Sequence, residues 1–190
     1  MRQIPNLLTL SRIALLPVIF VLFFAPIPGA RWMALAIYCL ASITDFFDGF
    51  LARKYNVQSS FGAMLDPIAD KLIIATILLL VVADGTLPRV HLPAIVIILC
   101  RELLVSGMRE YLAQLRISLP VSKLAKIKTA FQLIAIGFLV LGPSGDIIFR
   151  HTVFFGSILL WGAAILTLIT GYDYWRVAWR EQEKSKGQEK

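Results

Sequence analysis

The chain has 190 residues, of which 58% are hydrophobic and 16% are charged, and its mean hydropathy is +0.76. Ordinary soluble domains of this size carry more charge and fewer apolar residues, so the composition excludes that class. The formal net charge is +7. We therefore expect a basic integral membrane protein.

Six apolar segments are each long enough to cross about 30 Å of hydrocarbon. Lipid offers no partner to backbone N–H and C=O groups, so each segment must be a helix. The expected spans are 6–25, 31–52, 66–83, 93–113, 122–142 and 152–175. The predicted fold is therefore all-α, with a six-helix transmembrane catalytic domain over 1–175 and a polar cytoplasmic tail over 176–190.

The first segment also has features of a signal peptide, because Arg2 precedes it and the small-residue stretch 28–30 follows it. The apolar run is long for a signal peptide, and Arg12 interrupts it. We interpret it as an uncleaved first span. Cys39 and Cys100 fall within the second and fourth spans, where we expect buried thiols without disulfide or metal-ligand spacing.

The distribution of lysine and arginine predicts how the chain is oriented. If the N-terminus is inside, 12 of the 19 cations lie at the inner side, three in outer loops and four within spans. The positive-inside rule then puts both termini in the cytoplasm. A basic inner face suits anionic headgroups and phosphorylated substrates. Nucleic acid is not an expected partner, because no soluble module presents these charges.

Four aspartates gather where the second span ends and the third begins. Carboxylates in membrane helices are costly and usually mark a function. Spacings of three, four and seven residues place the acids of each span on one helical face beside small residues. These faces carry Asp45, Asp48, Gly49 and Ala52 on the second span, and Gly62, Asp66, Ala69 and Asp70 on the third.

Four carboxylates supply the hard oxygen ligands that Mg²⁺ or Mn²⁺ prefers. A structural alternative is a salt-bridge network in which Arg53 and Lys71 neutralise two of the acids. Asp45 is roughly 12 Å along a helix from Arg53, so the acids lie just beneath the cytoplasmic interface, at the depth of a lipid phosphate. Two metal ions about 3.5–4 Å apart suit in-line attack at phosphorus. The sequence thus favours two divalent cations and phosphoryl transfer.

The pattern Asp45-x2-Asp48-Gly49-x2-Ala52-Arg53-x8-Gly62-x3-Asp66-x3-Asp70 resembles the signature of the CDP-alcohol phosphotransferases at all eight fixed positions. The resemblance extends along nearly the whole chain. Segments 4–9, 101–110 and 126–129 resemble the members whose acceptor is glycerol 3-phosphate. The resemblance implies transfer of a phosphatidyl group from CDP-diacylglycerol to that acceptor, with release of CMP. It also implies a homodimer in the bacterial inner membrane.

The resemblance also implies roles for individual residues. The four aspartates would hold the two-metal centre, and Asp70 would also take the proton from the acceptor hydroxyl. The residues that would bind the CDP moiety are Gly49, Ala52, Arg53 and Gly62, with Asn6, Thr9 and Arg12 from the first span. For the last three the alternatives are a helix cap at Asn6 and Thr9 and an Arg12 side chain that snorkels to the interface.

A second anion site is expected for the acceptor phosphate. Arg109, Lys126 and Lys128 are cations at the inner ends of the fourth and fifth spans. Arg101 lies deeper, and its alternative role is an ion pair with an acid of the protein. Aromatic residues near span ends are expected to be interfacial anchors. They are Trp32, Trp161, Tyr172, Tyr174, Trp175 and Trp179.

Two rival functions follow from the same residues. The chemistry could use another acceptor, such as serine, inositol phosphate or phosphatidylglycerol, although an acceptor without a phosphate leaves the cations unpaired. A cation transporter would also place carboxylates in the membrane. Transporters usually show paired repeats and broken midplane helices, and the sequence shows neither.

Overall fold

The computed structural model describes the backbone over residues 4–55, 60–114 and 123–188. Side chains are described over 10–44, 67–113 and 124–172, and at 65, 174–176 and 179. Throughout these parts the regular elements are helical, which confirms the all-α prediction. They are α1 (Ile4–Phe24), α2 (Ala30–Tyr55), α3 (Ser60–Ala83), the 3₁₀ turn η1 (Arg89–His91), α4 (Leu92–Gln114), α5 (Lys123–Leu141), the 3₁₀ turn η2 (Gly142–Ile147) and α6 (Thr152–Gln188).

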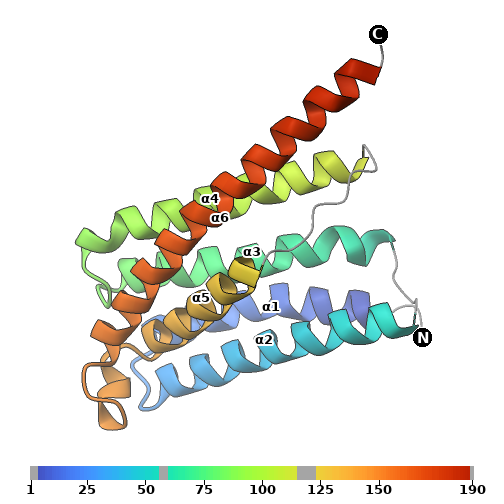
Figure 1. Cartoon of the computed structure of the whole chain (residues 1–190). Helices are drawn as coiled ribbons and strands as arrows, with labels where there is room; N and C mark the ends of the chain where they lie inside the picture. The colour runs from blue at the N-terminus through green and yellow to red at the C-terminus, as the bar shows by residue number, and fades with distance from the viewer. Residues whose placement is uncertain (1–3, 56–59, 115–122, 189–190) are drawn as a thin grey trace. The chain divides into compact units, whose positions relative to one another are not determined.

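Each predicted span coincides with one α-helix (Figure 1). Within the described residues, the stretches Arg89–Ala113, Leu124–Ile147 and Thr152–Arg176 are long and apolar enough to cross a membrane. Two shorter apolar stretches, Leu10–Phe24 and Ala30–Thr44, lie in α1 and α2. The chain is an all-α membrane protein, as its composition predicts.

The last helix continues beyond the sixth span. The apolar stretch ends at Arg176, close to the predicted end of the sixth span at residue 175, and α6 continues through the polar tail to Gln188. Residues 176–188 are rich in Arg, Glu, Gln and Lys, which are good helix formers, and no proline interrupts them. The helix therefore extends past the apolar segment, because helical propensity does not end where hydrophobicity does.

The helices form two compact units. One comprises residues 1–89 and 136–157, and the other comprises 90–135 and 158–190. In the first unit, α1 packs against both α2 and α3, and the three helices run side by side (Figure 1). This core is aliphatic, with Ile19, Ile77 and Leu78 at most 1% exposed. The packing matters for function, because α2 and α3 carry the predicted aspartate signature.

Arg31 ties together several chain segments of the first unit. Its guanidinium pairs with the Asp84 carboxylate and donates hydrogen bonds to Thr86 Oγ1 at 3.0 Å and to the Val140 carbonyl oxygen at 3.1 Å. The same group lies 3.8 Å from the centre of the Phe23 ring. One side chain thus connects the end of α1, the start of α2, the turn after α3 and the end of α5. Such a charge is tolerated in an apolar fold because its N–H groups have a carboxylate, a hydroxyl and a carbonyl as partners.

In the second unit, α6 approaches its neighbours closely at two glycines. A Cβ at Gly162 would lie 3.2 Å from Phe131 of α5, and one at Gly171 would lie 3.1 Å from the Arg101 side chain of α4. Small residues at helix contacts are typical of membrane proteins, where van der Waals packing drives association. The close contact at Gly171 brings α6 against the polar residues of α4.

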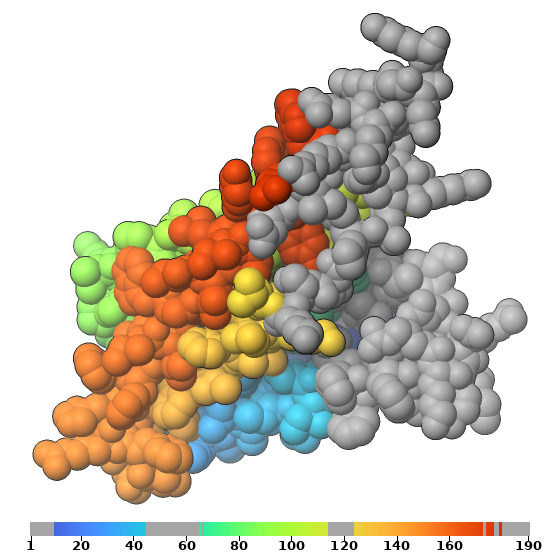
Figure 2. All heavy atoms as spheres, in the orientation of Figure 1, coloured from blue at the N-terminus to red at the C-terminus, as the bar shows by residue number. Residues whose placement is uncertain are grey.

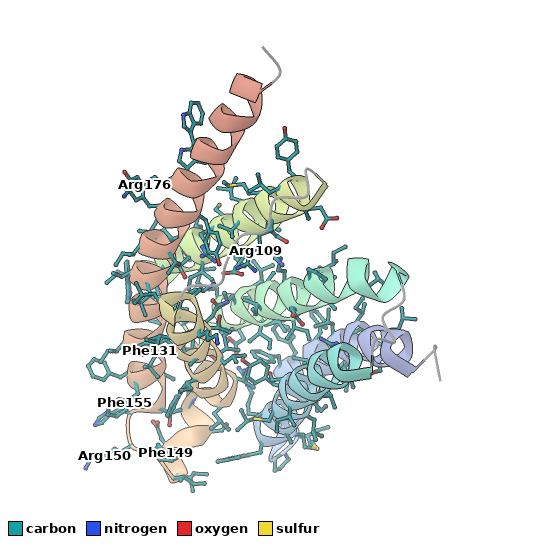
Figure 3. The ribbon with its side chains drawn as sticks, turned by 45° about the vertical axis from the view of Figure 1, so that its right-hand side comes forward. Arg109, Phe131, Phe149, Arg150, Phe155 and Arg176 are labelled. Atoms are coloured by element: carbon teal, nitrogen blue, oxygen red, sulfur yellow. The ribbon has the colours of Figure 1, made fainter. Side chains whose placement is uncertain are left out.

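Apolar side chains also cover much of the outer surface. On α6, Ile158, Ile165 and Leu168 are each more than half exposed, and Figure 2 shows the described part of this helix at the surface. Phe155 and Arg176 project outward from α6 (Figure 3). The prediction that Cys39 and Cys100 are buried is wrong, since both thiols are exposed. A lipid-facing position satisfies an apolar residue as well as the interior does, so hydrophobicity alone could not distinguish the two.

Candidate functional site

Arg12 and Asp70 form an ion pair between α1 and α3. Arg12 Nη1 donates to Asp70 Oδ1 at 2.9 Å. The Arg12 side chain is 2% exposed, whereas that of Asp70 is 43% exposed. The guanidinium is therefore buried against the core, which does not fit the alternative in which Arg12 snorkels to the interface. The carboxylate that it holds remains accessible from outside the protein.

The other predicted aspartates lie on the helices that the sequence predicts. Asp45 and Asp48 are in α2, and Asp66 is in α3. Their side chains lie outside the described residues, as do those of the residues predicted to bind CDP other than Arg12, which are Asn6, Thr9, Gly49, Ala52, Arg53 and Gly62. Among the described side chains no three His, Cys, Asp or Glu residues gather as a metal site, and Asp70 is the described member of the four acids.

What is described fits a divalent cation. Asp70 offers an accessible carboxylate oxygen donor, the ligand type that Mg²⁺ and Mn²⁺ prefer. Because α1 packs against both α2 and α3, the two helices that carry the four acids belong to one compact unit. Arg12 is one cation that partners Asp70, a pairing that spacing within α3 could not reveal because it joins distant helices.

A second charged arrangement lies in the other unit. Glu102 of α4 accepts hydrogen bonds from Lys128 Nζ of α5 and, at 3.3 Å, from Arg101 Nη1. Arg101 Nη2 also donates to Thr170 Oγ1 of α6 at 2.9 Å. Lys128 is 4% exposed. The alternative role of Arg101, an ion pair with an acid of the protein, is thus present, and its partner is the adjacent Glu102.

Arg109 belongs to the same arrangement. It extends from α4 (Figure 3) and donates from Nη2 to the phenol oxygen of Tyr174. The Tyr174 ring lies 4.8 Å from Cζ of Arg109 and 5.6 Å from Cζ of Arg101, so it joins Arg109 to the group around Glu102. We call Arg101, Arg109 and Lys128 the basic cluster. Lys126 points elsewhere, since it is exposed and lies two residues, about 200° around the helix, from Lys128.

Tyr174 is a residue whose place the sequence does not predict correctly. We expect an interfacial anchor, but its side chain is buried, at 6% exposure, against the basic cluster. Trp175, Tyr172 and Trp179 on the same helix are more than half exposed. A signal was available, because Tyr174 follows Thr170 by one helical turn and so shares the face that contacts Arg101.

Comparison with known proteins decides the family. Residues 2–169 match the CDP-alcohol phosphatidyltransferase family. The chain belongs to this family. The resemblance in the aspartate signature is thereby confirmed, and this family generally depends on divalent cations.

Relatives within the family are similar along almost their whole length. A protein of Rickettsia bellii is 49% identical over 92% of this chain and 94% of its own. A protein of Salmonella choleraesuis is 40% identical over 90% of this chain and 92% of its own. A protein of Cereibacter sphaeroides is 38% identical over 93% of this chain and 95% of its own. All three are named CDP-diacylglycerol–glycerol-3-phosphate 3-phosphatidyltransferase.

The burial of the Arg12–Asp70 pair predicts an asymmetry between two substitutions. Asp70→Asn removes the negative charge that the buried Arg12 guanidinium contacts and should lower the free energy of unfolding by about 3 kcal/mol. Arg12→Met removes the buried charge itself, and the accessible Asp70 carboxylate can then be solvated, so the loss should be smaller. Thermal unfolding of both variants in detergent measures this. A larger loss for Arg12→Met would contradict the described burial.

Proposed function

We propose that this chain transfers the phosphatidyl group from CDP-diacylglycerol to the primary hydroxyl of sn-glycerol 3-phosphate, giving phosphatidylglycerophosphate and CMP. The observation that carries the proposal is the similarity, over at least 90% of both chains, to relatives named for this reaction. Family membership and the aspartate signature support the same chemistry. The enzyme is thus a CDP-diacylglycerol-dependent phosphatidyltransferase.

The four aspartates are the proposed metal ligands. Asp45, Asp48, Asp66 and Asp70 would hold two divalent cations, Mg²⁺ or Mn²⁺. When bound, such cations stabilise negative charge on the attacking and leaving oxygens of an in-line displacement. The described accessibility of Asp70 supports a carboxylate that substrate can reach.

Asp70 is also the proposed general base. Its carboxylate takes the proton from the acceptor hydroxyl as that oxygen forms a bond to the phosphorus that bears diacylglycerol. The bond from this phosphorus to the bridging oxygen breaks, and CMP leaves with that oxygen. The Arg12 guanidinium, fixed on one carboxylate oxygen at 2.9 Å, restricts the orientation of Asp70. No covalent enzyme intermediate is needed.

The CDP moiety would lie against α2, α3 and α1. Gly49, Ala52 and Gly62 leave room beside the backbone, and Arg53 suits a diphosphate through its forked donors. Asn6, Thr9 and Arg12 recur every three residues along α1, so they lie near one another on that helix. The burial of Arg12 places it at the packed side of α1, which supports its assignment to the closed end of this pocket.

The acceptor phosphate would bind at the basic cluster. Arg101, Arg109 and Lys128 carry three positive charges, and Glu102 carries one negative charge, so the described groups sum to +2. Glycerol 3-phosphate is close to a dianion at neutral pH, and its phosphate matches that sum. Serine, which carries no phosphate, would leave the cations uncompensated, which disfavours it as an acceptor. Lys126 is also a candidate for binding the phosphate. Its side chain is exposed, so it is a weaker candidate than the buried Lys128.

The remaining assignments are also proposals. The positive-inside distribution supports cytoplasmic termini and an active site that opens to the cytoplasmic leaflet of a bacterial inner membrane. We propose a single catalytic domain over residues 1–175, with the end of α6 as a cytoplasmic extension, and a homodimer. The transporter alternative has no support from the family.

A direct assay tests the function. Purified protein is incubated with CDP-diacylglycerol and one acceptor at a time, with and without EDTA. We expect CMP release only with glycerol 3-phosphate and a divalent cation, because the proposed site needs both a phosphate and a metal. Faster CMP release with serine or inositol phosphate would overturn the acceptor assignment. Full activity in EDTA would overturn the metal assignment.

The two lysines of α5 provide an internal comparison. Lys128→Gln should raise the KM for glycerol 3-phosphate about tenfold, since the cluster loses a charge-assisted contact made by its buried member. Lys126→Gln removes the same charge from an exposed position two residues away, and its KM should change less than about twofold. Steady-state kinetics at fixed CDP-diacylglycerol measures both. Equal effects would show that overall charge, rather than the cluster, binds the acceptor.

A further inference from the structure

Tyr174 contacts two members of the basic cluster. Its phenol oxygen accepts a hydrogen bond from Arg109 Nη2. The ring also faces both arginines, with its centre 4.8 Å from Cζ of Arg109 and 5.6 Å from Cζ of Arg101. These separations lie within the range of a cation–π attraction. A single buried aromatic side chain from α6 thus fixes guanidinium groups that are eight residues apart on α4.

The turn of α6 that carries Tyr174 is itself held in place. Thr170, one turn earlier, accepts from Arg101 and donates to the Leu166 carbonyl oxygen at 2.8 Å. Gly171 has no Cβ, which lets α6 lie against the aliphatic part of Arg101. The tyrosine ring has few rotatable bonds and is buried, so it offers Arg109 a rigid partner.

The three cations of the cluster differ in how they are compensated. Arg101 and Lys128 share the Glu102 carboxylate. In the described part of the chain, Arg109 has no carboxylate within ion-pair distance, and its partner is the neutral phenol. A carboxylate at this place would orient Arg109 but would also neutralise it. A phenol orients the guanidinium and leaves its positive charge available to an anion.

We propose that Tyr174 is a positioning residue for the acceptor phosphate, which it serves by fixing Arg109 without neutralising it. This inference rests on the proposed function, since it takes Arg109 to bind the phosphate of glycerol 3-phosphate. An arginine that is free to rotate loses side-chain entropy when it binds a ligand. Because Tyr174 restricts Arg109 before the acceptor arrives, that loss is smaller and the acceptor binds more tightly.

Tyr174→Phe tests the role of the phenol oxygen. The variant keeps the ring, its burial and the cation–π contacts, and it lacks only the acceptor for Arg109. We expect the KM for glycerol 3-phosphate to rise about 5- to 20-fold, as for the loss of one hydrogen bond to a charged group. The kcat and the KM for CDP-diacylglycerol should each stay within about twofold, because the oxygen acts on acceptor binding alone. Tyr172→Phe, an exposed position on the same helix, is the matched control and should leave all three constants unchanged.

A double-mutant cycle with Arg109→Ala separates positioning from general packing. If Tyr174 acts through Arg109, Tyr174→Phe should change the KM for glycerol 3-phosphate less than about twofold once Arg109 is gone. A KM increase that persists in the Arg109→Ala background would overturn the inference. So would a Tyr174→Phe variant whose main change is in kcat, in the KM for CDP-diacylglycerol or in the melting temperature.

The same measurements distinguish this inference from the proposed function. If wild-type protein releases no CMP with glycerol 3-phosphate, or if Arg109→Ala leaves the KM for that acceptor unchanged, the acceptor assignment fails and the inference fails with it. If Arg109→Ala raises this KM and Tyr174→Phe does not, the acceptor assignment stands and the positioning role of Tyr174 is wrong.

Discussion

Charged side chains in an apolar helix bundle need partners, and this requirement organises the polar part of the structure. The buried Arg12 guanidinium is paired with Asp70, and the buried Lys128 ammonium shares Glu102 with Arg101. An isolated charge in such surroundings costs several kcal/mol, so each of these contacts is a condition for the helices to pack as they do. The described charges at which we place chemistry are therefore also part of what holds each unit together.

The buried charges of the two units have different kinds of partner. At Asp70 a buried cation holds an accessible carboxylate, and an acidic donor set on α2 and α3 suits divalent cations. At the basic cluster one carboxylate compensates two of three cations, and a neutral phenol orients the third. An excess of positive charge remains among these described groups. Under the proposed function, the first arrangement would serve metal-dependent chemistry and the second would bind an anionic acceptor.

Much of the fold could be predicted from the sequence because lipid restricts it so strongly. Hydrocarbon thickness sets the length of each apolar run, and the predicted spans coincide with the helices of the structure. The end of the sixth apolar span follows from hydropathy, whereas the helical conformation of the polar tail follows from residues that are good helix formers. The aspartate signature identified the family from spacing within two helices, and the comparisons confirm that family.

Contacts between helices were much less predictable, because spacing along one helix does not reveal which residues face it from another. The partnership of Arg12 with Asp70 joins α1 to α3, and that of Arg109 with Tyr174 joins α4 to α6. Tyr174 and Trp175 are both aromatic residues near the end of a span, yet the Tyr174 side chain is buried and the Trp175 side chain is exposed. The thiols of Cys39 and Cys100 show the same limit, since apolar positions in a membrane protein face either the core or the lipid.

The central claim is that the carboxylates of α2 and α3 bind divalent cations together. Its most direct test is a titration of purified protein with Mn²⁺, in which electron paramagnetic resonance measures the free ion. We predict saturable binding of about two Mn²⁺ per chain and affinity at least tenfold weaker in Asp66→Asn, because each ligand contributes to a shared site. Absence of saturable binding to the wild-type protein, or unchanged affinity in Asp66→Asn, would contradict the account.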